Sequence, residues 1–484
     1  MSYPGRRSVL AAVLAAAAAL VPRPVSAQDL IPGRVVERLA CLADAGRSYA
    51  LYLPSSFDPG KIWPLLVLFD PGARGPLAVE AFREAAEAHG WILAASNDSR
   101  NGPLRESGLA ALALWADVSK RFPLDERRVY TTGFSGGSRV ASIFPRVAGR
   151  PIAGIIGCGA GLASGVEPGT LGAAAYFGLA GLADFNYGEM KALDRSLDPS
   201  GIPHRFHYFE GSHAWPDRAS CARAVAWMEI MAMKQGLRPA DRGQAAAFIR
   251  RDFEEAKELE DTGRFFWAAD RLDAAARLAE GLDLDLAGLS DLPRRVEGLR
   301  ARKEYGRFIE AEKKRDRRAA EFREAFGGAF GAVEDAGTDG SPAVPKVLRE
   351  TGIAFLRKDA KGKGSIEDRA FASRLLFDFM FAARARASAL HGKGDLVRAA
   401  AYLDLAIAAC EEGLAMERAL HYDRACVAAR TGDKELALRH LAIAVDKGMA
   451  DLDLLETDKD LDPIRDTAAF REILQRADAA RVIK

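Results

Sequence analysis

The sequence predicts an α/β domain with a mostly parallel sheet flanked by helices, followed by an all-α domain of helical repeats. Short apolar runs with strand character occur before residue 236 and largely stop after it. Beyond that point alanine, leucine, arginine and glutamate recur at helical period. A chain of 484 residues is also too long for one hydrophobic core of ordinary size. We therefore expect one domain over residues 28–238 and a second over residues 239–484.

Four short runs, three apolar and the last strand-like, are the expected strands of the sheet, because each is closed by a glycine-rich or polar turn. They occupy residues 63–69, 129–132, 175–181 and 203–209. The residues that could carry chemistry follow these runs.

The run over residues 129–132 leads into Gly133-Phe134-Ser135-Gly136-Gly137 and then into an expected helix over residues 138–144. A strand that ends in G-x-S-x-G and enters a helix is typical of a nucleophile elbow. The turn is so tight that only glycine fits two positions before and two after the serine. A serine- and glycine-rich surface turn is the other interpretation. The preceding strand and the partners downstream favour Ser135 as a nucleophile.

A base for Ser135 is expected downstream of an acid, in the order Ser, Asp, His. Of the seven histidines, one precedes the serine and three lie in the helical region. His204 and His207 fall inside the last strand-like run, where a histidine usually belongs to a strand face. His213 lies just past that run, in a turn from which a side chain reaches the top of the sheet. The sequence therefore favours His213 as the base.

The acid is expected at the end of the strand that lies between Ser135 and His213. The run over residues 175–181 is followed by Asp184, which would hold the His213 tautomer and stabilise the imidazolium. Asp194 and Asp198 are alternatives, but both fall in the expected following helix. We therefore select Asp184.

An acyl-transfer site also needs two N–H donors for the tetrahedral oxyanion. Gly136, directly after the nucleophile, is the first expected donor. The second is expected in the glycine loop after residues 63–69, where Pro71 has no N–H and Gly72 or Ala73 must donate.

These motifs, together with Tyr49-Ala50-Leu51-Tyr52-Leu53-Pro54 and Gly211-Ser212-His213-Ala214-Trp215-Pro216, resemble the exported esterases of the polyhydroxybutyrate depolymerase and feruloyl esterase type, within the α/β-hydrolases. The similarity covers roughly residues 45–235. It implies that Ser135, Asp184 and His213 form a triad and that Trp215 lines the substrate pocket, where we also place Phe134. The chain has Asp70-Pro71 where such esterases commonly carry His-Gly.

Composition narrows the class of protein and its location. With 68 basic and 67 acidic residues the charge is nearly balanced, which argues against a nucleic-acid partner. Residues 1–27 have the basic, apolar and small-residue parts of a secretory signal, so we expect export to the periplasm or the medium. The apolar part has about 13 residues, short of the ~20 that span a membrane. Arg6-Arg7 leaves a twin-arginine route open.

The five cysteines lack metal-ligand spacing, and the sequence predicts neither a metal nor a cofactor. Cys158 and Cys221 could pair in the first domain, or both could be buried free thiols.

The second domain carries one spacing three times, G-x4-A-x3-L-x2-A. The copies begin at Gly263, Gly394 and Gly432. Each resembles the second half of a tetratricopeptide repeat, with the glycine in the turn of a helical hairpin. A generic helical bundle is the alternative. A charged helix is expected over residues 294–325, and its basic run at residues 313–318 has acidic neighbours typical of a solvated face.

Two classes of function remain. The first is a serine esterase for a small or polymer-linked ester, with a helical domain that binds a protein partner or shapes access to the cleft. The second is a binding protein whose hydrolase fold has lost activity. The intact order of triad residues favours the enzyme, and a serine peptidase is the alternative enzyme because it uses the same triad.

Overall fold

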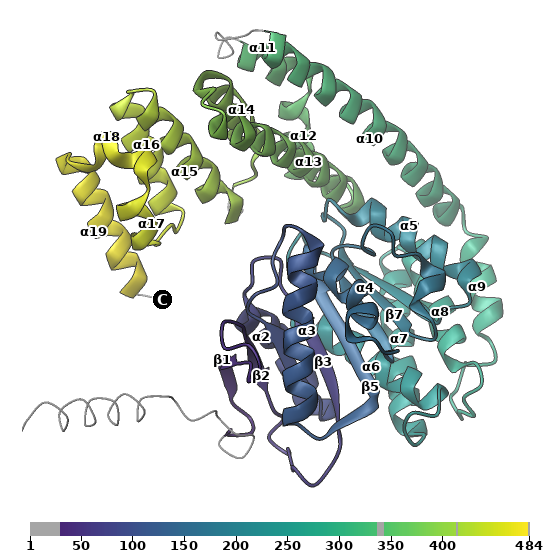
Figure 1. Ribbon diagram of the computed structural model, residues 1–484. Coiled ribbons are helices and arrows are strands. Elements are labelled where there is room, and N and C mark those ends of the chain that lie inside the picture. The colour runs from purple at the N-terminus through teal and green to yellow at the C-terminus, as the bar shows by residue number, and fades with distance from the viewer. Residues whose placement is uncertain (1–29, 336–342, 413–414, 483–484) are drawn as a thin grey trace, which may run out of the picture.

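A computed structural model of the chain describes residues 30–335, 343–412 and 415–482 (Figure 1). The predicted signal segment over residues 1–27 lies outside the described residues. The first part of the structure is built on an eight-stranded sheet with the order β1-β2-β4-β3-β5-β6-β7-β8. Its strands are β1 (Val35–Ala40), β2 (Ser48–Tyr52), β3 (Trp63–Phe69), β4 (Ile92–Ser96), β5 (Leu124–Phe134), β6 (Gly154–Cys158), β7 (Ala175–Gly181) and β8 (His204–Phe209).

The sheet is mostly parallel. Strand β2 pairs antiparallel with β1 and β4, and every pair from β4 to β8 is parallel. This order and direction define the α/β-hydrolase fold, which confirms the predicted fold class. The predicted runs over residues 63–69 and 175–181 coincide with β3 and β7.

Strand β3 shows why these runs become central strands. All its residues are buried, and their side chains alternate between two apolar cores. Leu66 and Leu68 belong to one core, and Leu65 and Val67 to the other. A parallel strand covered by helices on both faces needs such a continuous apolar run.

Helices cover both faces of the sheet. One face is covered by α2 (Gly75–His89) and α6 (Arg218–Lys234), and the other by α3 (Leu104–Arg121), α4 (Gly136–Ala148) and α5 (Tyr187–Leu197). Because β3, β5, β7 and β8 are parallel, the segments that follow them lie at the same edge of the sheet, where the carboxyl ends of these strands meet.

Among the described residues after 238, the secondary structure is helical. The helices are α7 (Arg242–Asp261), α8 (Phe265–Ala279), α9 (Leu292–Arg300), α10 (Lys303–Asp335), α11 (Ala343–Glu350), α12 (Ile353–Ala360), α13 (Ile366–Gly392), α14 (Leu396–Ala409), α15 (Ala415–Arg430), α16 (Lys434–Asp446), α17 (Leu452–Thr457), α18 (Asp462–Arg465) and α19 (Ala468–Val482). The prediction of one charged helix over residues 294–325 is wrong in one respect, because a break after Arg300 divides this segment between α9 and α10.

The three copies of the repeated spacing lie in three helical hairpins: α7–α8, α13–α14 and α15–α16. Gly263, Gly394 and Gly432 occupy the turns with φ of 75°, 80° and 87°, a region that favours glycine. The alanines and leucines of each copy are buried in the second helix of its hairpin. Figure 1 shows α13 and α14 side by side.

Helices α7, α8 and α9 pack on the α/β unit. Ile249 of α7, Leu272 of α8 and Val296 of α9 belong to the same apolar core as β3 and α6. The predicted boundary between residues 238 and 239 therefore lies inside a continuous core. Helices α13 to α16 contribute to two other apolar clusters.

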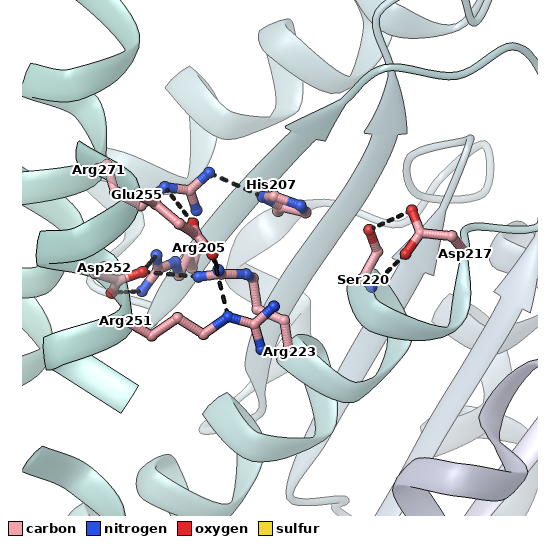
Figure 2. A network of polar contacts seen from close by, with 9 residues as sticks. All are labelled: Arg205, His207, Asp217, Ser220, Arg223, Arg251, Asp252, Glu255 and Arg271. Atoms are coloured by element: carbon pink, nitrogen blue, oxygen red, sulfur yellow. Dashed lines mark hydrogen bonds and ion pairs between the residues drawn. The ribbon is translucent and has the colours of Figure 1, made fainter. Parts of the chain in front are cut away.

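A buried ionic network joins α7 to the sheet (Figure 2). Asp252 of α7 accepts hydrogen bonds at 2.7 to 2.8 Å from Arg205 of β8 and Arg223 of α6. Glu255, one turn further along α7, contacts Arg223 and Arg271 of α8.

Within the described residues, no helix is long and apolar enough to cross a membrane.

Candidate active site

Ser135 occupies the sharp turn between β5 and α4. Its φ and ψ of 53° and −120° make it one of two non-glycine residues with positive φ in the described part of the chain. The neighbouring glycines are required by space. A Cβ on Gly133 would lie 2.2 Å from the backbone of Gly137, and one on Gly137 would lie 2.0 Å from the Phe69 carbonyl oxygen. The turn therefore holds the Ser135 hydroxyl at the edge of the sheet in a strained conformation.

His213 and Asp184 complete a chain of hydrogen bonds with Ser135. His213 Nε2 lies 2.9 Å from Ser135 Oγ, and His213 Nδ1 lies 2.8 Å from Asp184 Oδ1. The Asp184 side chain is 1% exposed and that of His213 12%. Asp184 Oδ1 also accepts the backbone N–H of Asn186 at 2.8 Å. With Nδ1 protonated toward Asp184, Nε2 accepts the proton of the Ser135 hydroxyl.

The other histidines and acids weighed from the sequence lie elsewhere. Asp194 and Asp198 face His204, with closest contacts to Nε2 of 3.6 and 3.4 Å. His207 Nδ1 contacts the Arg271 guanidinium at 3.1 Å. Burial and the arginines around it hold the pKa of His207 well below its usual range. These groups therefore contact other side chains than Ser135.

The predicted oxyanion donors differ in their surroundings. Gly136 is the first residue of α4, where helix geometry leaves the N–H without an intrahelical acceptor. Gly72 donates its N–H to Asp70 Oδ1 at 2.7 Å, and Ala73 donates to the Asp70 carbonyl oxygen at 3.2 Å. Neither of these two N–H groups is free in this structure. The Asn101 carboxamide packs against Gly136, since a Cβ there would lie 1.9 Å from Asn101 Oδ1.

Asp70 joins the loop after β3 to the turn that carries His213. Its fully buried carboxylate accepts the Trp215 indole N–H at 2.8 Å and two hydrogen bonds from the Arg74 guanidinium at 2.9 and 3.0 Å. Burial raises the pKa of Asp70, but the hydrogen bonds from Arg74, Trp215 and Gly72 outweigh it and lower the pKa below the ordinary value. The sequence marked Asp70 only as a departure from His-Gly and did not predict this role.

Aromatic rings surround the His213 imidazole. The Phe134 ring centroid lies 4.6 Å from that of His213 and 5.7 Å from that of Trp215. Phe185, directly after Asp184, lies closer still, with its centroid 4.1 Å from His213. The position of Phe185 next to the acid was the only signal in the sequence that could have pointed to it.

The five cysteines are buried free thiols, so the possible Cys158–Cys221 pair is not formed. Burial raises the pKa of Cys158 to about 12, which leaves it an unreactive thiol. In the described part of the chain, one group of potential metal ligands comes together, Cys426, Asp458 and Asp460. It belongs to the α15 region, and Asp460 is already in contact with His391 and Arg430.

Comparisons with known proteins gave likeness in structure alone. No family model and no curated protein sequence matches the chain. Among solved structures, Thermogutta terrifontis esterase 2 phosphonylated by sarin is 13% identical, with a TM-score of 0.34, over 45% of this chain and 100% of that one. A ferulic acid esterase is 14% identical, with a TM-score of 0.34, over 42% and 99%. An S-formylglutathione hydrolase from Staphylococcus aureus is 17% identical, with a TM-score of 0.31, over 38% and 90%. Similarity of this size adds nothing to the assignment of the site, which rests on the contacts of Ser135, His213 and Asp184.

Proposed function

We propose that the protein is a serine hydrolase of carboxylic esters that uses Ser135, His213 and Asp184. The observation that carries the proposal is the hydrogen-bonded series Asp184–His213–Ser135, with contacts of 2.8 and 2.9 Å, on the strained turn of an α/β-hydrolase fold.

Acylation begins when Ser135 Oγ attacks the ester carbonyl carbon and His213 Nε2 takes the hydroxyl proton. Asp184, buried and bound to Nδ1, stabilises the imidazolium that forms. The Gly136 N–H stabilises the tetrahedral oxyanion. To act as the second donor, Gly72 or Ala73 would exchange its bond to Asp70 for one to the oxyanion. His213 then gives its proton to the leaving alcohol, and water hydrolyses the acyl-enzyme by the reverse use of the same groups.

Two alternatives have less support. A binding protein on a decayed hydrolase scaffold would not need the strained φ of Ser135, which costs stability. A peptidase would use the same triad but requires an extended groove for the peptide backbone, and the aromatic rings around His213 are better suited to an apolar group.

We also propose, from the sequence, that the chain is exported and that the helical repeats bind a partner or shape the cleft.

Labelling with a fluorophosphonate probe tests the proposed function. The full-length wild-type protein should be labelled and the Ser135→Ala variant should not, because the probe bonds only to an activated serine hydroxyl. A panel of aryl esters of increasing acyl length, beside a matched panel of peptide amides, then separates esterase from peptidase. Equal labelling of wild type and Ser135→Ala would refute the assignment.

A further inference from the structure

Helix α13, outside the sheet, lies against the segment that carries Asp184. Leu182 and Tyr187, on either side of the acid, share an apolar cluster with Ala370 of α13. Arg374 of α13 donates a hydrogen bond to the Leu182 carbonyl oxygen, and its guanidinium lies 4.5 Å from the Tyr187 ring centroid. These contacts fix the position of α13 relative to the triad.

The next turns of α13 bring one phenylalanine beside the proposed catalytic histidine and a second beside the first. Phe377 stacks on Phe185 with centroids 4.8 Å apart and planes 5° apart, and lies 6.3 Å from His213. Phe381 lies 6.0 Å from Phe185 and 6.2 Å from Phe377, again nearly parallel to both. Phe381 is 51% exposed, so a broad apolar ring faces solvent beside the site. An exposed phenylalanine among stacked rings offers a surface on which a ligand can pack.

The role of His213 decides which part of the substrate meets these rings. His213 Nε2 must protonate the oxygen of the departing alcohol, so that oxygen comes within hydrogen-bond distance of the imidazole. The group attached to it therefore lies beside His213. Three rings lie along this imidazole. The Phe134 ring also contacts Trp215, whereas Phe185 and Phe377 lead to Phe381 on α13.

We propose that Phe185, Phe377 and Phe381 form the binding site for the leaving alcohol and make the enzyme selective for esters of flat, apolar alcohols. This inference rests on the proposed function. The nearly parallel rings favour an aromatic alcohol in an offset stack over a small aliphatic one. Helix α13 thus supplies specificity-determining residues to a site whose reacting groups follow strands of the sheet.

The surroundings of Phe381 leave room for a larger alcohol. Phe381 lines a cavity of about 400 Å³ between α13 and α15, together with Tyr422, His391 and Asp458. A volume of this size is within the usual range for small-molecule sites. An alcohol with an aromatic ring next to the ester oxygen and a polar extension would place that extension beyond Phe381.

The test compares benzyl acetate with ethyl acetate in wild type and Phe381→Ala. Both esters form the same acetyl-enzyme, so differences in kcat/KM report only acylation and alcohol binding. We expect Phe381→Ala to lower the benzyl-to-ethyl ratio of kcat/KM by about 3- to 10-fold. Phe355→Ala is the control, since Phe355 is 71% exposed on α12 and should leave the ratio unchanged. Phe377→Leu repeats the test within the stack while retaining an apolar side chain.

A second series separates the alcohol side from the acyl side. With 4-nitrophenyl acetate, butanoate and hexanoate the leaving group is constant, and the dependence on acyl length should be the same in wild type and Phe381→Ala. A benzyl-to-ethyl ratio that stays within twofold of wild type in both variants overturns the proposal, as does a changed acyl-length profile. Fluorophosphonate labelling of each variant keeps the two proposals apart. A labelled variant with an unchanged ratio refutes the alcohol site alone, whereas a wild type that is not labelled refutes the proposed function.

Discussion

Asp252 of α7 accepts two hydrogen bonds from the Arg205 guanidinium of β8, at 2.7 and 2.8 Å, and both side chains are almost fully buried. Arg223 of α6 donates a further bond at 2.7 Å to the same carboxylate. Burial opposes the ionisation of Asp252, but the charges of Arg205 and Arg223 outweigh it and lower its pKa. The helix after the predicted domain boundary thus balances buried positive charge inside the α/β unit.

Asp252→Ala should lower the free energy of unfolding by about 3 to 5 kcal/mol, because two buried guanidinium groups lose their counter-charge. Asp261→Ala, on the same helix, is the control. It breaks an exposed pair with Lys257, which water and salt screen, and should change the free energy of unfolding far less. Urea unfolding followed by circular dichroism measures both. Similar losses in the two variants would contradict a special role for Asp252.

The loss of this counter-charge should also appear on truncation. A truncated chain of residues 28–238 should unfold more easily than one of residues 28–301, which retains Asp252.

Ser135→Gly should be more stable than Ser135→Ala by about 1 kcal/mol, because glycine adopts the φ of 53° without the cost that a Cβ incurs. Both variants should lose ester hydrolysis by several orders of magnitude, since no nucleophile remains. Thermal unfolding and initial rates on 4-nitrophenyl acetate provide the two measurements. Equal stability of the two variants would show that the turn is not strained in solution.

His213→Ala should lose activity to about the same extent as Ser135→Ala, because the residues of the proposed triad would act as a unit. His207→Ala is the matched control, since His207 contacts Arg271 on α8 rather than the reacting groups. It should retain most of the activity. Steady-state rates of the two variants on one aryl ester measure the difference. Loss of activity in His207→Ala but not in His213→Ala would assign the base to His207.

The helical region should lose stability at acid pH through His440. Burial and the nearby Arg424 lower its pKa to about 4, and its Nδ1 lies 2.8 Å from Nδ1 of His421. The unfolded chain binds a proton near pH 6.5 and the folded chain only near pH 4, so the stabilising effect of the neutral ring is present at neutral pH and is lost as pH falls through this window. Urea unfolding at pH 7 and pH 4.5 should show a smaller decrease for His440→Gln than for wild type. An equal decrease would place the acid sensitivity in other groups.

The residues of the candidate site could be predicted because their signals are local. Central strands such as β3 and β7 read as continuous apolar runs, since helices bury both their faces. The nucleophile turn needs glycine at Gly133 and Gly137 for lack of space, and chain order selects His213 and Asp184 from few candidates. The repeated glycines were predictable in the same way, because a helical hairpin turn requires positive φ.

Other features depend on contacts between residues far apart in the chain, which no local pattern records. Asp70 and Trp215 are separated by 145 positions, and Arg374 and Leu182 by 192. Phe377 and Phe381 fall in the region predicted to be helical, with no local signal of a role. Only packing of α13 against Leu182 and Tyr187 brings Phe377 to His213 and Phe381 to Phe185. Strands and turns could be predicted because the pattern of apolar residues and the backbone geometry of glycine are properties of short segments. The shape of the cleft and the pairing of buried charges follow from which surfaces meet when the chain folds, and these are decided by tertiary structure alone.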